Sequence, residues 1–220
     1  SAMFDYLKDL GVTTLYLLPF ADSPMSDAGF DVKNPRNIRA DLGGKAEFKD
    51  FVIEAKKNGF KIKSDLVLNH ISDEHEWFQK AMKDPDGEYG KYFYIAEKKD
   101  GKLPCNWRSY FGGSVWEPIP GTDKYYLHSF HKKQPDLNWD NPQVREHVYD
   151  MMNWWCEKGI DGFRMDVISL ISKPEGLPDG KAGENGYGDS GCANGPHVHE
   201  YLQEMNREVL SKYDLITVGE

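Results

Sequence analysis

Ionisable side chains close three apolar segments of this 220-residue chain. Residues 65–70 end in Asn-His, Arg164 and Asp166 lie in a second segment, and Glu220 follows a third. Because side chains alternate along a strand, Arg164 and Asp166 point to the same side, so the guanidinium is expected to keep the carboxylate ionised. An ionised carboxylate can act as a nucleophile.

Two carboxylates at neighbouring strand ends suit one reaction in particular. Glu220 on an adjacent strand could approach Asp166 to about 5 Å, the separation used in retaining glycoside hydrolysis. There one carboxylate attacks the anomeric carbon while its protonated partner gives a proton to the leaving oxygen. The alternative is structural: Arg164 and Asp166 form an ion pair, Glu220 is a solvated charge, and His70 satisfies backbone groups. The coincidence of three such clusters favours a site.

The elements that must position these residues alternate between helix and strand. The expected segments are a helix over 4–10, a strand over 13–18, a helix over 45–57, a strand over 60–68, a helix between Asn141 and Gly159, a strand over 162–168, a helix from Pro196 and a strand over 215–218. This order predicts a parallel α/β sheet with right-handed crossovers. The carboxyl ends of its strands share one rim, where such folds build their sites.

Residues 71–139 interrupt this alternation. They contain no long periodic segment, but they are rich in Trp, Tyr and Phe, and the whole chain is 13% aromatic. Long segments of this kind inside a domain are usually functional or form small domains of their own. We therefore expect an inserted, loop-rich subdomain, and a second, glycine-rich loop over 173–195.

Composition excludes several classes of partner. Acidic residues outnumber basic ones by 36 to 27, which gives a net charge of -9 and disfavours nucleic acid. The longest apolar run covers only residues 15–18, so no membrane span is expected. Residues 1–3 lack the features of a signal or transit peptide.

Neither a metal site nor a cofactor is expected. The three cysteines are odd in number and widely spaced, which argues against a disulfide framework and favours a reducing, cytoplasmic setting. The histidine pairs 128/131 and 197/199 could suggest a metal site, but the pair 197/199 lies at the start of a predicted amphipathic helix with no nearby cysteine or acidic set.

Four segments of the chain resemble the ordered regions of glycoside hydrolase family 13, the α-amylase superfamily. They are residues 65–70 (DLVLNH), 162–166 (GFRMD) and 218–220 (VGE), together with 134–138 (QPDLN), which is similar to the mark of the oligo-1,6-glucosidase subfamily. The resemblance covers essentially the whole chain. It implies part of a TIM (β/α)8 barrel, the second to fifth strands, in which 1–70 and 140–220 are barrel and 71–139 is the inserted B-type domain.

The resemblance implies catalytic roles for three residues. Asp166 would be the nucleophile, Glu220 the general acid/base, and Arg164 the group that holds the nucleophile ionised. Oligosaccharide would be the substrate.

Four further residues would contact or select the sugar. His70 would hydrogen-bond the sugar in the cleavage subsite, and Asp31 would bind hydroxyls of the nonreducing glucose. Phe30 replaces the family's usual tyrosine, so stacking is kept and a phenolic hydrogen bond is lost. Val167, after the nucleophile, accompanies α-1,6 activity in relatives.

The expected function is a retaining α-glucosidase acting on short, α-1,6-linked glucosides. The alternatives are a transglycosylase, such as trehalose synthase or sucrose isomerase, and an inactive barrel fragment or binding module. The first strand, the last three strands, the calcium-type loop, the third catalytic carboxylate and the C-terminal β domain of the family are not found in this sequence. The chain by itself is therefore expected to be inactive, and its open sheet edges predict self-association.

Overall fold

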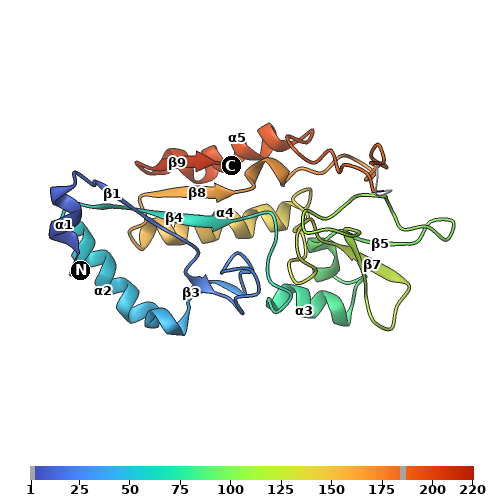
Figure 1. The fold of residues 1–220 in the computed structure, drawn as a ribbon, viewed down its shortest axis with the longest axis horizontal. Coiled ribbons are helices and arrows are strands. Elements are labelled where there is room, and N and C mark those ends of the chain that lie inside the picture. The colour runs from blue at the N-terminus through green and yellow to red at the C-terminus, as the bar shows by residue number, and fades with distance from the viewer. Residues whose placement is uncertain (1–2, 184–186) are drawn as a thin grey trace.

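A four-stranded parallel sheet forms the frame of the molecule (Figure 1). The computed structural model describes residues 3–183 and 187–220. In it β1 (Thr14–Leu17), β4 (Lys61–Val67), β8 (Gly162–Asp166) and β9 (Ile216–Gly219) pair in that order, so spatial order follows chain order. The predicted parallel α/β sheet is confirmed, and the carboxyl ends of its strands lie on one rim.

Helices connect successive strands of this sheet, as predicted. After α1 (Phe4–Asp9), α2 (Gly44–Lys57) links β1 to β4, α4 (Pro142–Glu157) links β4 to β8, and α5 (Val198–Glu208) links β8 to β9. The start of α4 is set by Asn141, whose side chain accepts a hydrogen bond from the Gln143 backbone N–H at 3.0 Å. Pro142 then takes the first helical position, where its missing N–H costs nothing.

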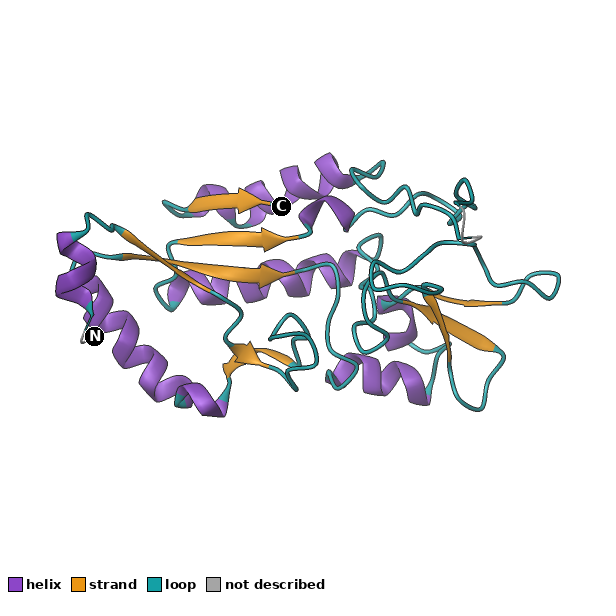
Figure 2. Ribbon diagram, viewed as in Figure 1, coloured by secondary structure: helices purple, strands orange, loops and turns teal. Residues whose placement is uncertain are grey.

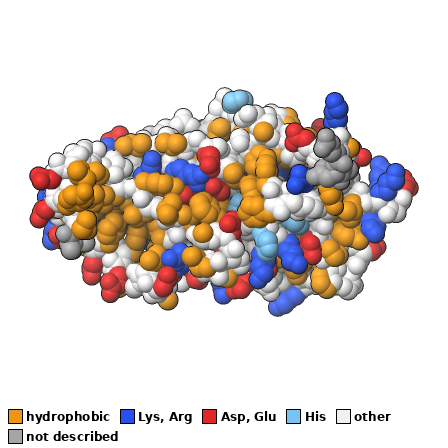
Figure 3. Space-filling view, viewed as in Figure 1, with side chains coloured by type: hydrophobic (Ala, Val, Ile, Leu, Met, Phe, Trp, Pro, Cys, Tyr) orange, Lys and Arg blue, Asp and Glu red, His pale blue; other side chains and the backbone are white. Residues whose placement is uncertain are grey.

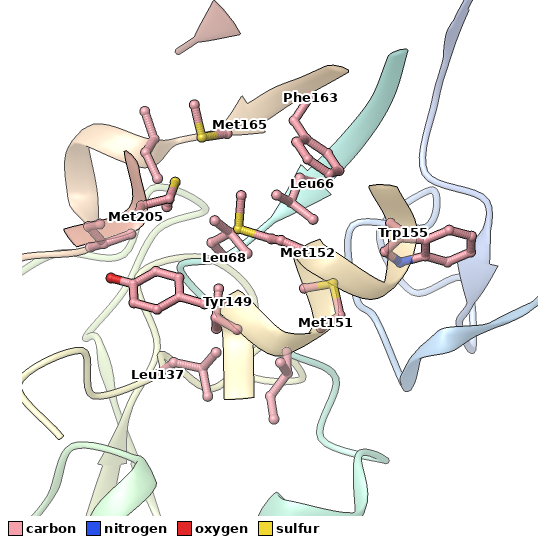
Figure 4. Close-up of a cluster of buried hydrophobic side chains, with 14 of the residues drawn as sticks. Leu66, Leu68, Leu137, Tyr149, Met151, Met152, Trp155, Phe163, Met165 and Met205 are labelled. Carbon is pink, nitrogen blue, oxygen red and sulfur yellow. The ribbon is translucent and has the colours of Figure 1, made fainter. Parts of the chain in front are cut away.

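The main core lies between α4 and the central strands. Figure 4 shows Met152 of α4 facing Leu66 of β4 and, beyond it, Phe163 and Met165 of β8, with Met151 on the same helix farther from the strands. All five side chains are at most 7% exposed. Burying these large apolar groups holds β4 and β8 in a fixed register, which in turn fixes the polar residues at their ends.

The segment between β1 and α2 contains structure that the sequence did not predict. β2 (Ala21–Asp22) and β3 (Asn34–Ile38) form an antiparallel pair, followed by the 3-10 helix η1 (Ala40–Leu42). These strands are short and turn-rich, so their pattern resembles that of a loop.

The inserted segment has its own sheet. It comprises α3 (Glu76–Lys83), η2 (Tyr89–Tyr92), β5 (Ile95–Glu97), β6 (Trp116–Pro118) and β7 (Lys124–Leu127), with the strands antiparallel in the order β5-β7-β6. Figure 2 shows it beyond the ends of β4 and β8. The longest helix in it is α3, whose eight residues span only about two turns and are capped by His75 rather than by Ser, Thr, Asp or Asn, so it gave no long periodic signal in the sequence.

A second apolar cluster joins the insertion to the loop that follows β8. Its buried members are Cys105, Trp107, Val115, Trp116, Leu127, Leu170 and Cys192. Asn106 adds two polar bonds to this contact, since its amide binds the backbone O and N of Gly180, both at 2.9 Å. Residues 184–186 of the predicted glycine-rich loop lie outside the described residues.

Several strand and helix ends differ from the sequence prediction. The strand expected over 162–168 stops at Asp166, because Val167 adopts a left-handed conformation and the 3-10 helix η3 (Ile168–Leu170) begins there. The last helix begins at Val198 rather than Pro196, and η4 (Leu210–Lys212) separates it from β9.

Apolar side chains remain exposed at the outer strands. Figure 3 shows hydrophobic side chains gathered at the end of the molecule that carries α1 and β1. Leu18 beyond β1 is 66% exposed, and Ile216 and Val218 of β9 are 42% and 44% exposed. No helix in the described residues is long and apolar enough to cross a membrane.

Candidate active site

One guanidinium joins three parallel strand ends. Arg164 Nη1 donates to Asp166 Oδ1 at 2.7 Å and to Asp65 Oδ1 at 3.0 Å, and Nη2 donates to Glu220. Asp65 and Arg164 are register partners on β4 and β8, while Glu220 follows β9. The structure therefore brings the predicted pair of carboxylates to a single cation.

Asp65 is the member of this network that the sequence did not single out as a site residue. It lies in the segment 65–70, two residues before the end of β4, and its side chain has no exposed surface. Its pairing with Arg164 spans 99 positions. Only the register of β4 against β8 reveals it.

Burial has a larger effect than Arg164 on the pKa of Asp166. Desolvation raises the pKa of Asp166 to about 6, against the hydrogen bond and the charge of Arg164, which lower it. Burial would also lower the pKa of Arg164, but its bonds to Asp65 and Asp166 raise that pKa. At neutral pH Asp166 is then mostly ionised. Arg164 lowers the pKa of Asp166, as expected, but the desolvation of this carboxyl raises it by more.

Two aromatic side chains contact this network. The Tyr16 hydroxyl of β1 donates to Asp65, and burial together with this bond raises the pKa of Tyr16 to about 12. The Phe30 ring lies 5.9 Å from the Arg164 guanidinium carbon. Phe30 is thus close to the charged cluster, as a sugar-stacking residue would have to be.

Val167 has an unusual backbone. Its φ of 41° and ψ of 38° lie in the left-handed region, which a β-branched residue rarely adopts. Its side chain packs partly buried against the second apolar cluster. Backbone strain of this kind concentrates at functional sites, and here it directly follows Asp166.

His70 lies in a buried polar pocket. It is 2% exposed, and burial lowers its pKa, so the ring is neutral. Its ring nitrogens lie 3.2 Å from Asn69 Nδ2 and 3.3 Å from Gln134 Nε2. Gln134 belongs to the segment 134–138, so this motif contacts the histidine of the first motif directly.

A series of contacting aromatic rings extends from His70 to the surface. The Phe130 ring lies 5.1 Å from the His70 ring and stacks on Tyr110 at 5.0 Å, and Phe111 meets Phe130 edge-on at 5.8 Å. Tyr110 and Phe111 are each 58% exposed. The sequence indicated an aromatic insertion, but it did not indicate which rings would lie beside His70.

Asp31 occupies a different environment from the other candidates. Its side chain accepts hydrogen bonds from Ser23 Oγ at 3.0 Å, the Ser26 N–H at 2.7 Å and the Asp27 N–H at 3.0 Å. The residue is 0% exposed. In this structure its carboxylate stabilises the turn before Phe30, and contact with a sugar hydroxyl stays a prediction.

The histidine pairs considered for metal binding have other partners. His128 Nδ1 lies 2.9 Å from the Phe130 carbonyl oxygen, and His197 Nδ1 lies 3.0 Å from Glu200. Across residues 3–183 and 187–220, no group of three or more His, Cys, Asp or Glu side chains is arranged to hold a metal ion.

The family model "Alpha amylase, catalytic domain" matches residues 1–220. The chain is 52% identical to the oligo-1,6-glucosidase of Parageobacillus thermoglucosidasius, covering 100% of this chain and 40% of that protein. It is 49% identical to an α-glucosidase of Pediococcus pentosaceus, and the match again covers 100% of this chain and 40% of that protein.

Solved structures agree with this match. The trehalose-6-phosphate hydrolase of Bacillus licheniformis superposes with a TM-score of 0.93 and 44% identity, covering 99% of this chain and 39% of that one. The trehalulose synthase MutB of Pseudomonas mesoacidophila superposes with a TM-score of 0.93 and 39% identity, covering 100% of this chain and 39% of that one. The expected fold class, part of a TIM barrel with an inserted domain, is confirmed. The chain spans about two fifths of the length of these relatives.

Proposed function

Because the chain belongs to the α-amylase catalytic-domain family, we propose that it carries the nucleophile and the acid/base of a retaining α-glucosidase. The observation that carries this proposal is the shared guanidinium. Arg164 binds both Asp166 and Glu220, so the two carboxylates are close neighbours at the rim. A close pair is what the retaining mechanism requires.

The chemistry then runs in two displacements. Asp166 attacks the anomeric carbon, and Glu220 gives its proton to the departing glycosidic oxygen, which leaves a covalent glucosyl-Asp166 ester. Glu220 next takes a proton from a water molecule that attacks the same carbon, and Asp166 leaves as a carboxylate. Arg164 stabilises the negative charge that returns to Asp166.

The substrates we propose are short α-glucosides with α-1,6 linkages. Relatives named oligo-1,6-glucosidase support this, at 52% and 50% identity. His70, Asp31 and Phe30 would bind the nonreducing glucose. The exposed rings of Tyr110 and Phe111 would form an apolar surface for the remaining sugar units of the substrate. Val167 would set the linkage preference.

A second candidate is transglycosylation. A trehalulose synthase and an isomaltulose synthase superpose with TM-scores of 0.93 and 0.92 at 39% and 40% identity. The same glucosyl intermediate would then react with a sugar hydroxyl instead of water. Product analysis with isomaltose, maltose and sucrose separates the two candidates.

A chimaera provides the main test. The chain replaces its counterpart in the Parageobacillus enzyme, to which it is 52% identical. The chimaera is expected to hydrolyse isomaltose, and Asp166→Asn and Glu220→Gln should each lower kcat by about 10³-fold or more. Asp123→Asn, an exposed aspartate in the insertion, serves as control. Cleavage of maltose but not isomaltose would refute the linkage preference, and full activity of Asp166→Asn would refute the mechanism.

The chain alone is proposed to be inactive. No turnover of p-nitrophenyl α-glucoside is expected from the purified 220 residues, and robust turnover would contradict this. The proposed domain boundaries are 1–70 and 140–220 for the barrel and 71–139 for the insertion. Their support is the separate β5-β7-β6 sheet of the insertion. The cytoplasmic setting stays an expectation, supported by three unpaired cysteines in the described residues.

A further inference from the structure

A tight turn before Phe30 holds an unfavourable backbone conformation. The Phe30 N–H donates to the Asp27 carbonyl oxygen at 2.8 Å, and the two residues between them, Ala28 and Gly29, have φ angles of 49° and 98°. Both angles lie in the left-handed region, which an alanine adopts only at a cost in free energy. A turn of this kind persists only where the surrounding structure holds it in place.

A buried glutamine from the inserted segment binds one end of this turn. Gln134 is 0% exposed, and its Nε2 donates to Asp27 Oδ2 at 2.8 Å across 107 positions of the chain. The other end of the amide is also bonded, since Oε1 accepts from the His131 N–H at 3.1 Å. A backbone N–H only donates and an ionised carboxylate only accepts, so both partners require the same orientation of the Gln134 amide.

Asp27 connects this glutamine to the rest of the turn. Its N–H donates to Asp31 Oδ1 at 3.0 Å, so Asp27 is bonded to Gln134 through its side chain and to Asp31 through its backbone. Gly29 packs against Pro19, because a Cβ at this glycine would lie 3.0 Å from the Pro19 carbonyl oxygen. The turn is therefore held between the insertion and the segment that follows β1.

We propose that Gln134 and Asp27 are positioning residues, whose hydrogen bond keeps the turn 27–30 left-handed and so keeps the Phe30 ring beside Arg164. The ring lies 5.9 Å from the guanidinium carbon. The stacking of Phe30 on a sugar rests on the proposed function. The effect of the bond on the turn does not, because it concerns only contacts within the folded chain.

Both the length and the polarity of Gln134 suit this role. An asparagine would be one methylene too short to bind His131 and Asp27 together. A glutamate would still accept from the His131 N–H, but it would place a second carboxylate against Asp27. An apolar side chain could fill the buried space, but it would leave the Asp27 carboxylate without this donor.

Site-resolved hydrogen exchange of the Phe30 amide tests the turn without substrate. In the 220-residue chain, Asp27→Ala and Gln134→Glu are each expected to speed this exchange about tenfold or more, because each removes the bond that holds the turn. Asp27→Asn keeps an acceptor oxygen and should stay within about threefold of wild type. The β4 amides should keep their protection throughout, and Asp123→Ala, at an exposed aspartate, should leave the exchange of Phe30 unchanged.

The double variant distinguishes a direct bond from two independent effects. Asp27→Ala combined with Gln134→Glu should exchange at the rate of Asp27→Ala alone, because the glutamate then faces no carboxylate and no bond is left to break. Multiplied effects, about a hundredfold together, would overturn the proposal. So would a Phe30 amide that exchanges at the wild-type rate in Asp27→Ala, or as fast in Asp27→Asn as in Asp27→Ala.

Kinetics of the chimaera then test the connection to the sugar. Asp27→Ala is expected to lower kcat/KM for isomaltose about tenfold when residue 30 is phenylalanine, and by less than about twofold in a Phe30→Ala background. Equal losses in both backgrounds would contradict an action through Phe30. A chimaera without any glucosidase activity would refute the proposed function instead, and the exchange rates would still decide the role of Gln134 and Asp27.

Discussion

Arg164 is the residue on which the geometry of the candidate site depends. It binds Asp65, Asp166 and Glu220 with one planar group, while only 17% of its side chain is exposed. A guanidinium can do this because its donors are spread over a rigid fork, whereas an ammonium is a point charge. The charge of Asp166 is a balance between this cation and the desolvation of the site.

Asp166→Asn should stabilise the folded chain at pH 7 by about 1–2 kcal/mol. The pKa of Asp166 is raised from 3.8 to about 6, so the folded chain holds this proton more tightly than the unfolded chain does. Its contribution to stability is present below the unfolded pKa and is lost as pH rises through the folded pKa. Urea unfolding at pH 3 and pH 7 measures the difference.

The gain from Asp166→Asn should nearly vanish at pH 3, where the carboxyl is protonated in both states. Asp123→Asn, at an exposed position, should show no such pH dependence. An equal gain at both pH values would mean that desolvation of the charge is not the cause.

At the scale of elements, two contacts join parts of the chain that are far apart in the sequence. Asn106 binds the loop after β8 to the insertion, and Gly162 lets β9 approach β8. Both act on backbone rather than on substrate. Each contact can therefore be tested through local stability, without a catalytic assay.

Asn106→Ala should loosen the loop over 173–195 while leaving the sheet intact. The substitution removes the two hydrogen bonds between the Asn106 side chain and the Gly180 backbone, whereas the bond from the backbone N–H of residue 106 to Asp179 remains. We therefore expect the local stability of this contact to fall by about 1–2 kcal/mol. Limited proteolysis should cut this loop faster. Asn34→Ala, which removes a bond within β3, is the matched control and should leave the loop protected.

Gly162→Ala should separate β9 from β8. A Cβ at this position would lie 2.1 Å from the Ile216 carbonyl oxygen, a backbone atom that cannot rotate away. We expect a loss of about 2 kcal/mol or more and faster hydrogen exchange in β9. The β1–β4 amides should keep their protection, and uniform loss across all four strands would contradict a local effect.

For the whole molecule, the open sheet is the dominant feature. The outer edges of β1 and β9 have no neighbouring strand in the described part of the chain, and apolar side chains beside them are exposed. Such edges favour pairing with another chain. Self-association is therefore our proposal for the chain in isolation.

Charges at these edges should reduce that self-association. Leu18→Lys and Ile216→Lys together are expected to lower the weight-average mass measured by analytical ultracentrifugation at a given concentration. Leu42→Lys adds the same charge at an exposed leucine of η1 and should change little. A monomeric wild-type chain at all concentrations would refute the proposal.

Much of the frame was predictable because its signals are local. Apolar runs and helical periodicity depend on neighbours within a few residues, so the four parallel strands and the helices between them could be predicted. Asp166, Arg164 and Glu220 could be placed at one rim because parallel strands all end on the same side. The motifs at those ends also indicated the family.

The tertiary structure alone decided the long-range contacts that no sequence pattern predicted. The Asp65–Arg164 contact crosses 99 positions, and the Lys173–Asn69 contact crosses 104. These depend on strand register and on how the insertion folds back, neither of which is encoded in a local pattern. The burial of Asp31, the left-handed Val167 and the raised pKa of Asp166 likewise follow from packing, because desolvation depends on everything that surrounds a group in space.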